Sequence, residues 1–436
     1  MHDFPVEYRN KCSYLWGDSL RVILHSDLNA FYASVECLHQ LDIRHKPVAV
    51  CGHQELRHGI VLAKNQLAKQ YGVKTGDAIW QARQKAPGLV EVPPNFPLYM
   101  KFSQLVRNIY LQYTPHVESF GLDEAWLDLT QPGMTLEQGR IIAEELRRRV
   151  KEEIGLTVSI GVSWNKIFAK LGSDYQKPDA VTLITPENYR SLVWPLPASD
   201  LLYVGPATGK KLARYGITTI GGIANTPPDL LHAWLKKWGL YLHTFANGWD
   251  KSPVQSADSI VPIQSIGNSI TAPHDLENEE DVKLTLYMLS ESVAARLRSH
   301  GFRCQTVQIS IRDIGLGWFS RQQRLSRSSN LSGEIADAAM ALFCRHYDWQ
   351  RSVRSLGVRG CDLVPDTEPE QISVFLDEQQ RRKQQALEHA MDDLRTRFGD
   401  AVIKRGVLLT DPAIGLVNPK DDHTIHPVGY FAHGVS

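Results

Sequence analysis

Apolar residues near the start of the chain form a short run followed by a helical stripe. The run at 22–24 leads to Asp27, and the next residues place Phe31, Val35 and Leu38 on one face of a helix. Such a run is typical of a buried strand, and such a stripe is typical of an amphipathic helix. After an N-terminal extension, residues 1–19, the pattern therefore predicts a buried strand that leads into a helix.

Expected strands and helices alternate up to about residue 187. Residues 117–129 predict two strands joined by a turn at 121–123. Residues 136–154 predict a helix that covers a sheet with a stripe including Ile141 and Leu146. The other expected strands lie at 47–50, 59–62 and 157–162, and the other expected helices at 65–71, 78–85 and 101–113. This alternation with an antiparallel hairpin predicts an α+β fold.

The second half of the chain has a different pattern. Residues 195–253 predict short helices, whereas 264–364 predict a separate unit of helices and alternating strands. The tail, beyond an acidic linker at 365–370, contains one helical stripe of apolar residues: Ala386, Leu387, Ala390, Met391, Leu394 and Phe398. A chain of 436 residues is too long for one core, so several domains are expected.

Composition narrows the class of protein only a little. Hydrophobic residues make up 43% and charged residues 22%, as in ordinary globular proteins. Lys plus Arg and Asp plus Glu each number 48, so net charge does not indicate nucleic acid, although a balanced total can hide a basic groove. The six cysteines form no C-x-x-C pair, which argues against a zinc ribbon. Residues 1–14 lack the apolar core of a signal peptide, and no run reaches membrane length, so we expect a cytoplasmic protein.

Acidic residues lie at the ends of the expected strands. Asp27 ends the first apolar run, and Asp123 and Glu124 lie in the hairpin between Leu122 and Ala125. An Asp-Glu pair usually marks a solvated turn, but solvated carboxylates are not expected between apolar neighbours. Two adjacent hard cations need carboxylates from more than one chain segment. If these strands pair, the three side chains form a two-metal site suited to in-line displacement at phosphorus.

Three segments together resemble a known family. They are D-L-N-A-F-Y-A-S-V-E at 27–36, L-D-E-A-W-L-D at 122–128 and S-W-N-K-I-F-A-K-L-G-S-D-Y-Q-K-P at 163–178. In this order they resemble the Y-family DNA polymerases, over residues from about 20 to 364. Residues 59–76 look most similar to the bacterial branch that includes the polymerase V catalytic subunit and polymerase IV-like relatives of Gram-positive bacteria.

The resemblance implies a right-hand polymerase that adds deoxynucleotides to a primer end on template DNA and bypasses damaged bases with low fidelity. Asp27, Asp123 and Glu124 would be its catalytic residues. They would bind two Mg²⁺ ions, which Mn²⁺ could replace, with the backbone carbonyl of Leu28 as a further ligand.

Neighbouring residues are implied to hold the incoming nucleotide. Phe31 and Tyr32 would lie under its sugar and triphosphate, and Tyr32 matches the steric gate that rejects a ribose 2′-hydroxyl. The alternative for both rings is a place in the core. Lys177 matches a lysine that contacts the triphosphate, and the alternative there is an ordinary loop charge.

The fingers segment departs from the family pattern. Many members place Thr, Tyr and Arg on the β- and γ-phosphates, whereas this chain has Ala63, Gln66 and Lys69 at the matching positions. Lys69 keeps the positive charge but lacks the bidentate fork of arginine. Ala63 and Lys69 are still expected beside the nucleotide. Gly121 stands where relatives often have serine, and this change is not expected to remove catalysis.

The segment G-P-A-T-G-K at 205–210 is close to a phosphate-binding P-loop. Its spacing is one residue short, and Lys211 stands where Ser or Thr is required. A helix-hairpin-helix fits better, because Gly205 and Gly209 then open a helix whose amides, with Lys210, could hold a DNA phosphate. In the family this module forms the thumb, and an ordinary helix start is the alternative.

Residues 264–364 resemble the little-finger domain of the family. Basic residues between Ser and Gln suit contact with backbone phosphates, so Arg312, Arg321 and Arg324 are expected to bind DNA. The same stretch also contains Arg296, Arg298, Arg303 and Arg327. Without the polymerase motifs, these arginines would indicate only a solvated face.

A short segment in the linker resembles a docking peptide. Gln371, Ile372, Val374 and Phe375 are similar to the Q-L-x-L-F peptide by which bacterial polymerases bind the sliding clamp. Apolar anchors on a linker suit capture by a pocket on a partner. An ordinary strand or helix start is the alternative, and residues 377–436 indicate no role.

The expected partners of a monomeric enzyme are primer–template DNA, deoxynucleoside triphosphates and the clamp. A catalytically silent DNA-binding scaffold would have lost a carboxylate, and a nucleotidyl cyclase would need neither thumb nor little finger. The three carboxylates therefore favour an active polymerase. Its expected parts are a palm (20–39 and 95–187), fingers (40–94), a thumb (188–255), a little finger (262–364) and a tail (365–436).

Overall fold

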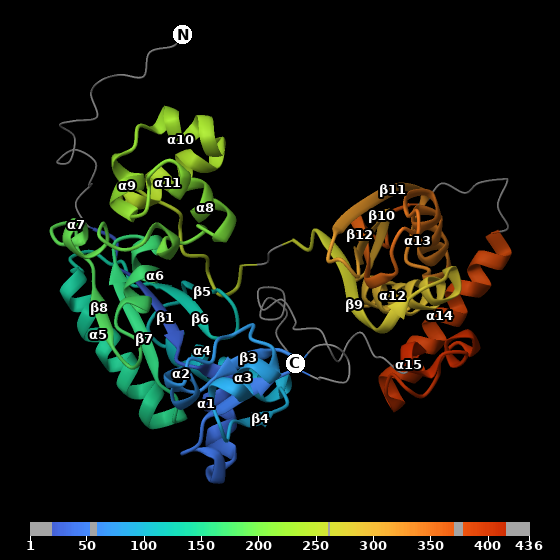
Figure 1. The fold of residues 1–436 in the computed structure, drawn as a ribbon, viewed down its shortest axis with the longest axis horizontal. Helices are drawn as coiled ribbons and strands as arrows, with labels where there is room; N and C mark the ends of the chain where they lie inside the picture. The colour runs from blue at the N-terminus through green and yellow to red at the C-terminus, as the bar shows by residue number, and fades with distance from the viewer. Residues whose placement is uncertain (1–19, 53–58, 260–261, 370–377, 416–436) are drawn as a thin grey trace. The chain divides into compact units, whose positions relative to one another are not determined.

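The computed structural model describes residues 20–52, 59–259, 262–369 and 378–415, which form two compact units (Figure 1). The first unit takes in most of the residues before 261, and the second takes in the described residues from 262 onward. Both units combine helices with strands, in agreement with the predicted α+β multidomain fold. No helix in these ranges is both long and apolar enough to cross a bilayer.

A five-stranded sheet forms the centre of the first unit, in the order β5-β6-β1-β7-β8. The central strand β1 pairs antiparallel with β6 and with β7, while β8 is parallel to β7. β1 is buried along its whole length, as its apolar run predicts. The strands span Ile23–Leu28 (β1), Val117–Ser119 (β5), Glu124–Asp128 (β6), Val158–Ser163 (β7) and Val181–Leu183 (β8).

Helices cover both faces of this sheet. On one face the Ser26 hydroxyl lies 2.7 Å from the hydroxyl of Tyr110 in α4, and Gly139 of α5 packs against Val22 and Leu24. The opposite face is covered by α6. Ile141 of α5 is 56% exposed, so the predicted stripe is wrong at this residue. The helices span Phe96–Tyr110 (α4), Leu136–Arg149 (α5) and Lys166–Tyr175 (α6).

A close contact between backbones fixes α6 on β7. A Cβ atom at Gly161 would lie 1.9 Å from the Ala169 carbonyl oxygen and 2.4 Å from the Ser173 nitrogen, so only glycine fits there. The helix begins where the Asn165 side chain accepts a hydrogen bond from the Phe168 amide at 2.8 Å. The sequence thus determines both where α6 begins and how closely it approaches the sheet.

A smaller sheet and a group of short helices complete the first unit. Strand β2 pairs antiparallel with β3 and parallel with β4. These strands and their helices span Val48–Cys51 (β2), Val61–Lys64 (β3), Val90–Val92 (β4), Phe31–His39 (α1), Gln66–Gln70 (α2) and Ile79–Lys85 (α3). The predicted all-helical stretch, 195–253, contains Pro206–Arg214 (α8), Ile220–Asn225 (α9), Pro228–Leu235 (α10) and Lys237–Ala246 (α11), and it is preceded by Tyr189–Leu192 (α7).

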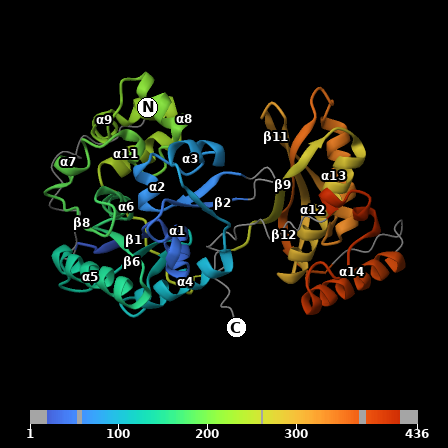
Figure 2. The same cartoon turned by 60° about the horizontal axis from the view of Figure 1, so that its bottom comes forward.

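A four-stranded antiparallel sheet, in the order β11-β10-β12-β9, forms the centre of the second unit. Helices α12 and α13 cover one of its faces (Figure 2), where Val307, Ile309 and Ile311 are buried. Its elements span Ser265–Leu276 (β9), Glu279–Ser299 (α12), Phe302–Asp313 (β10), Trp318–Ser329 (β11), Ser332–His346 (α13) and Val353–Pro365 (β12).

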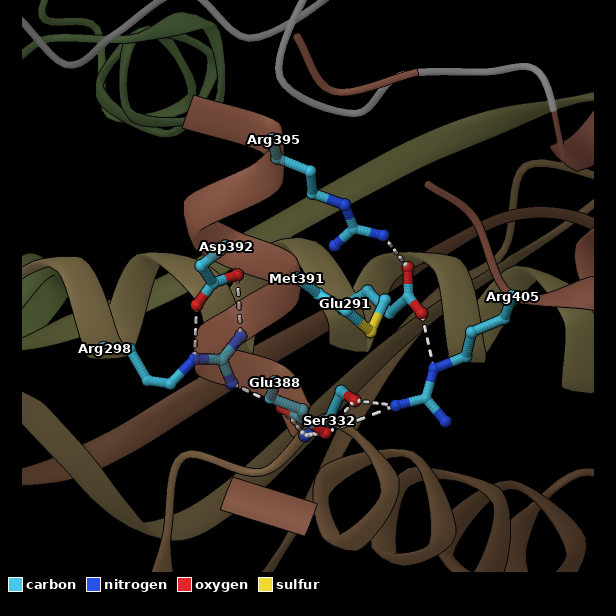
Figure 3. A pocket seen from close by; sticks show the side chains of 8 residues that line it. All are labelled: Glu291, Arg298, Ser332, Glu388, Met391, Asp392, Arg395 and Arg405. Atoms are coloured by element: carbon cyan, nitrogen blue, oxygen red, sulfur yellow. Dashed lines mark hydrogen bonds and ion pairs between the residues drawn. The ribbon is translucent and has the colours of Figure 1, made fainter. Parts of the chain in front are cut away.

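Charged side chains dominate the contact of the tail helix with this unit. Figure 3 shows Glu388 between Arg298 and Ser332, and the Glu388 side chain is only 3% exposed. Arg298 also pairs with Asp392 at 2.6 Å, and Arg405 pairs with Glu388 at 3.2 Å. The tail elements span Glu378–Phe398 (α14), Gly406–Leu409 (η5) and Pro412–Gly415 (α15).

The tail helix has the predicted stripe of apolar residues, but most of these side chains are exposed and do not pack against the second unit. Met391 is buried, whereas Leu387 and Leu394 are exposed and Phe398 is 68% exposed. The face of α14 that lies against the unit is instead formed by charged residues such as Glu388. Apolar spacing thus predicts this helix but does not mark the face on which it packs.

Candidate active site

The predicted carboxylates meet where the end of β1 lies beside the start of β6 in the five-stranded sheet. Asp27, in β1, lies directly opposite Glu124, in β6, so both side chains project from the same face. Asp123 comes immediately before β6, and its carbonyl accepts a hydrogen bond from the Leu28 amide at 2.9 Å. The backbone segments of Asp27, Leu28, Asp123 and Glu124 are thus adjacent, as the two-metal hypothesis requires.

The turn before β6 is shaped by glycine. Gly121 has φ 95°, in the left-handed region, and a Cβ there would lie 3.2 Å from Oδ1 of Asp123. The Leu122 carbonyl accepts a hydrogen bond from the Ser103 hydroxyl at 2.5 Å. The turn therefore brings Asp123 close to α4.

Burial, more than the crowding of negative charge, changes the acidity of the carboxyl groups. Burial raises the pKa of Asp27, which is 5% exposed. Burial, followed by the charges of Asp27 and Glu124, raises the pKa of Asp123 to about 7. A cluster that resists ionisation in this way has a strong requirement for nearby positive charge.

Two lysines provide positive charge at the cluster. Lys170 Nζ lies 2.9 Å from Glu124 and 3.2 Å from Asp27, and Lys177 Nζ lies 2.6 Å from Asp27 and 2.6 Å from Asp174. Burial alone would lower the pKa of Lys170, but Glu124 and Asp27 raise it above its ordinary value. Within the described ranges, no three Asp, Glu, His or Cys side chains lie in an arrangement that could hold a metal ion.

Lys170 and His25 were not among the predicted site residues, although each leaves a signal in the sequence. Lys166, Lys170 and Asp174 lie four residues apart, on one face of α6. His25 lies two residues before Asp27 in a strand, so both side chains project from the same face. Burial, followed by the charge of Lys170, holds the pKa of His25 well below its ordinary value, so the ring is neutral.

Tyr32 and Phe31 occupy different surroundings. The Tyr32 ring is stacked on Tyr99 with centroids 4.4 Å apart, and burial and the Asp123 charge raise the pKa of Tyr32 to about 12. Tyr32 follows Asp27 by five residues, at the start of the helix that comes after β1. Phe31 is buried in the hydrophobic core next to Tyr99.

The residues of the fingers segment that were compared with the phosphate contacts of the family lie in β3 and α2. Ala63 lies in β3 and Lys69 lies in α2, where its side chain is exposed. Lys69 lowers the pKa of Lys64, after the larger effect of burial, so the two lysines are near each other. Gln66, at the start of α2, is also exposed.

The predicted DNA-binding residues fall into two groups, one in each unit. Gly205 caps the N-terminus of α8, Gly209 lies within that helix, and Lys210 is exposed on it. In the second unit, Arg312 is paired with Trp318 and Arg324 with Thr306, which places both arginines on the face opposite the helices.

The register places Arg321 on the other face of the sheet from Arg312 and Arg324. Arg321 is paired with the buried Ile309, and its guanidinium lies over the Phe319 ring. Arg321 therefore projects from the face of the sheet that the helices cover. Arg298 and Arg327 form ion pairs with Glu388 and Glu378 in the tail helix, and are not free for phosphate. The predicted clamp peptide, Gln371, Ile372, Val374 and Phe375, lies outside the described residues.

Comparison with known proteins gives consistent matches. The impB/mucB/samB family model matches residues 26–174, and the model of its C-terminal domain matches 263–374. The DNA polymerase IV of Acetivibrio thermocellus is 52% identical over 397 residues, which cover 91% of this chain and 100% of that protein. That of Moorella thermoacetica is 38% identical over 396 residues, which cover 90% and 97%. The solved Y-family DNA polymerase chimera Dbh-Dpo4(243-245)-Dbh shares the fold, with a TM-score of 0.70 at 24% identity over 79% of this chain and 99% of the chimera.

Proposed function

Because the chain belongs to the Y-family of DNA polymerases, in the DNA polymerase IV group, we propose that Asp27, Asp123 and Glu124 are its catalytic metal ligands. The protein is a DNA-directed DNA polymerase of the translesion kind, with a role in DNA repair. Members of this family use divalent metal ions. The alternative of a catalytically silent scaffold has no support, since all three carboxylates are present.

The arrangement of the carboxylates is the observation that carries this proposal. Asp27 is opposite Glu124 in the β1–β6 register, and Asp123 is next to Glu124. The residues fit a divalent cation, because burial and mutual repulsion raise the pKa of Asp123 to about 7 and two lysines partly balance the charge. We propose two Mg²⁺ ions, replaceable by Mn²⁺, with the Leu28 carbonyl as a further ligand. Bound ions of this kind activate the primer hydroxyl and neutralise the triphosphate.

The residues of this chain would then orient the nucleotide. Lys177, which pairs with Asp27 in this structure, would contact the triphosphate instead. Lys170 would keep a positive charge next to Asp27. Tyr32 would act as the steric gate, because its stacking on Tyr99 holds the ring in place against a 2′-hydroxyl. Phe31, Ala63 and Lys69 would complete the pocket.

The remaining parts of the function follow the domain assignment. The proposed palm (20–39 and 95–187) bears the carboxylates, and the fingers (40–94) bear Ala63 and Lys69. The proposed thumb (188–255) would hold DNA phosphate at Gly205, Gly209 and Lys210, and the little finger (262–364) would do so through Arg312 and Arg324. A monomer in the cytoplasm, tethered to the sliding clamp by 371–375, is the proposed working form.

Primer extension by the purified chain tests this proposal. With Mg²⁺ and four deoxynucleotides, we expect short products on an undamaged template and on one with an abasic site. Asp123→Asn should lower extension at least about thousandfold on both, with primer–template affinity unchanged, because it removes charge but not volume. Asp128→Asn, at the other end of β6, is the matched control and should extend normally. Extension retained by Asp123→Asn would refute the metal assignment.

A further inference from the structure

A buried histidine lies directly behind the proposed metal ligands. The His25 side chain is 0% exposed, and its Nε2 lies 3.3 Å from Oε2 of Glu124. The geometry falls outside that of a hydrogen bond, so both atoms lack a hydrogen-bond partner among the described residues. Unpaired buried polar atoms are costly, and each such case in a folded protein calls for an explanation.

The other ring nitrogen indicates which atom carries the proton. His25 Nδ1 lies 2.8 Å from Oγ of Ser173, and the same oxygen lies 2.8 Å from the Lys170 carbonyl. The hydroxyl has one hydrogen and can donate to only one of these acceptors. If it donates to Nδ1, that nitrogen carries no hydrogen and the ring hydrogen is on Nε2, facing the Glu124 carboxylate. The opposite tautomer would direct a lone pair at that carboxylate, which is unfavourable.

Packing keeps the ring in this position. The rings of Trp126 and His25 pack at an angle of 64°, with centroids 5.0 Å apart, and Trp126 is itself held by a hydrogen bond from Nε1 to the Lys166 carbonyl at 3.0 Å. On its other side His25 is paired with Gly161, against which α6 packs. The ring therefore has little freedom to turn away from Glu124.

We propose that His25 is a positioning residue: a small shift of the Glu124 carboxylate, now 3.3 Å from Nε2, would let it accept a hydrogen bond from Nε2, which would hold it in place for a divalent cation, while Ser173 selects the tautomer. This inference rests on the proposed role of Glu124 as a metal ligand. Partners that orient a ligand from behind typically change metal affinity by about 10–100-fold. The competing explanation is that His25 only fills space in the core.

Two substitutions separate these explanations. In His25→Gln the side-chain amide nitrogen takes the place of Nε2, whereas in His25→Asn the shorter side chain places its amide nitrogen near Nδ1 only. Mn²⁺ binding is measured by electron paramagnetic resonance, in complexes with primer–template DNA and a non-hydrolysable deoxynucleotide. We expect His25→Asn to weaken binding at least about tenfold and His25→Gln to remain within about threefold of the unmodified chain. Ser173→Ala should weaken binding several-fold, because Nδ1 loses its donor.

The controls distinguish failure of this inference from failure of the proposed function. If Glu124→Gln binds Mn²⁺ as well as the unmodified chain does, Glu124 is not a ligand and the proposed function fails. If Glu124→Gln loses an ion while His25→Asn and Ser173→Ala bind normally, only the positioning role is refuted. If His25→Asn and His25→Gln lose Mn²⁺ affinity equally and both have a lowered melting temperature, the positioning role is also refuted, because lost packing alone would then explain the weaker binding.

Discussion

Replacing Glu388 should release the tail helix from the second unit. Its carboxylate accepts hydrogen bonds from the Ser332 amide and hydroxyl at 3.1 and 2.6 Å and pairs with Arg298 and Arg405. The Glu388 and Arg298 side chains are 3% and 5% exposed, so the magnitude expected is that of a buried pair rather than a surface pair. Removing one partner of a buried pair costs about 3–5 kcal/mol. Arg298 keeps Asp392, so Glu388→Ala should fall near the lower end, at about 3 kcal/mol.

Hydrogen exchange of the α14 amides is the suitable assay, because a chain of two compact units does not unfold in a single transition. A loss of about 3 kcal/mol should speed exchange in α14 roughly hundredfold, since each 1.4 kcal/mol is about tenfold. Asp393→Ala is the matched control, an exposed acidic residue on the same helix, and should change the opening free energy by less than about 0.5 kcal/mol. If both variants exchange alike, the ion-pair network does not hold the tail.

Three further predictions concern the proposed active site and its partner. Tyr32→Ala should let the enzyme insert ribonucleotides at rates near those of deoxynucleotides, and unchanged discrimination in single-nucleotide insertion would place the gate elsewhere. The pKa of Asp123 is raised to about 7, so this carboxyl holds a proton below that pH, and the Mg²⁺ concentration for half-maximal extension should fall by up to about tenfold per pH unit as pH rises from about 6 to about 7. A flat dependence would mean that no proton competes with the ion. Deleting 371–376 should abolish stimulation by the sliding clamp and leave unstimulated extension intact, and stimulation that survives would eliminate the docking peptide.

The part of the site that the sequence predicts well depends on short-range patterns. A buried apolar run ending at Asp27 and an acidic pair in a hairpin are both local features, and the β1–β6 pairing then brings them together. His25 could have been found by the same reasoning, since alternation in a strand places it on the face of Asp27. Its partner Ser173 is 148 residues away, and no local pattern indicates that contact.

The features that the sequence does not reveal have a common cause in long-range pairing. The face to which Arg321 belongs depends on the β10–β11 register, which pairs Arg321 with Ile309. The packed face of α14 depends on partners such as Glu291, which pairs with Arg395 of this helix and lies 104 residues before it. Periodicity finds the apolar stripe of such a helix but cannot reveal that distant charges will favour the other face.

The glycine contact between β7 and α6 has a consequence for how this enzyme can change. Because Gly161 lies directly against the backbone at Ala169, the height of α6 above the sheet is set by main-chain atoms and not by side-chain volume. Substitutions elsewhere in the core can be absorbed by repacking without moving the helix that bears Lys170 and Ser173. A side chain at position 161 would therefore push α6 away from the sheet and move both Lys170 and Ser173 with it.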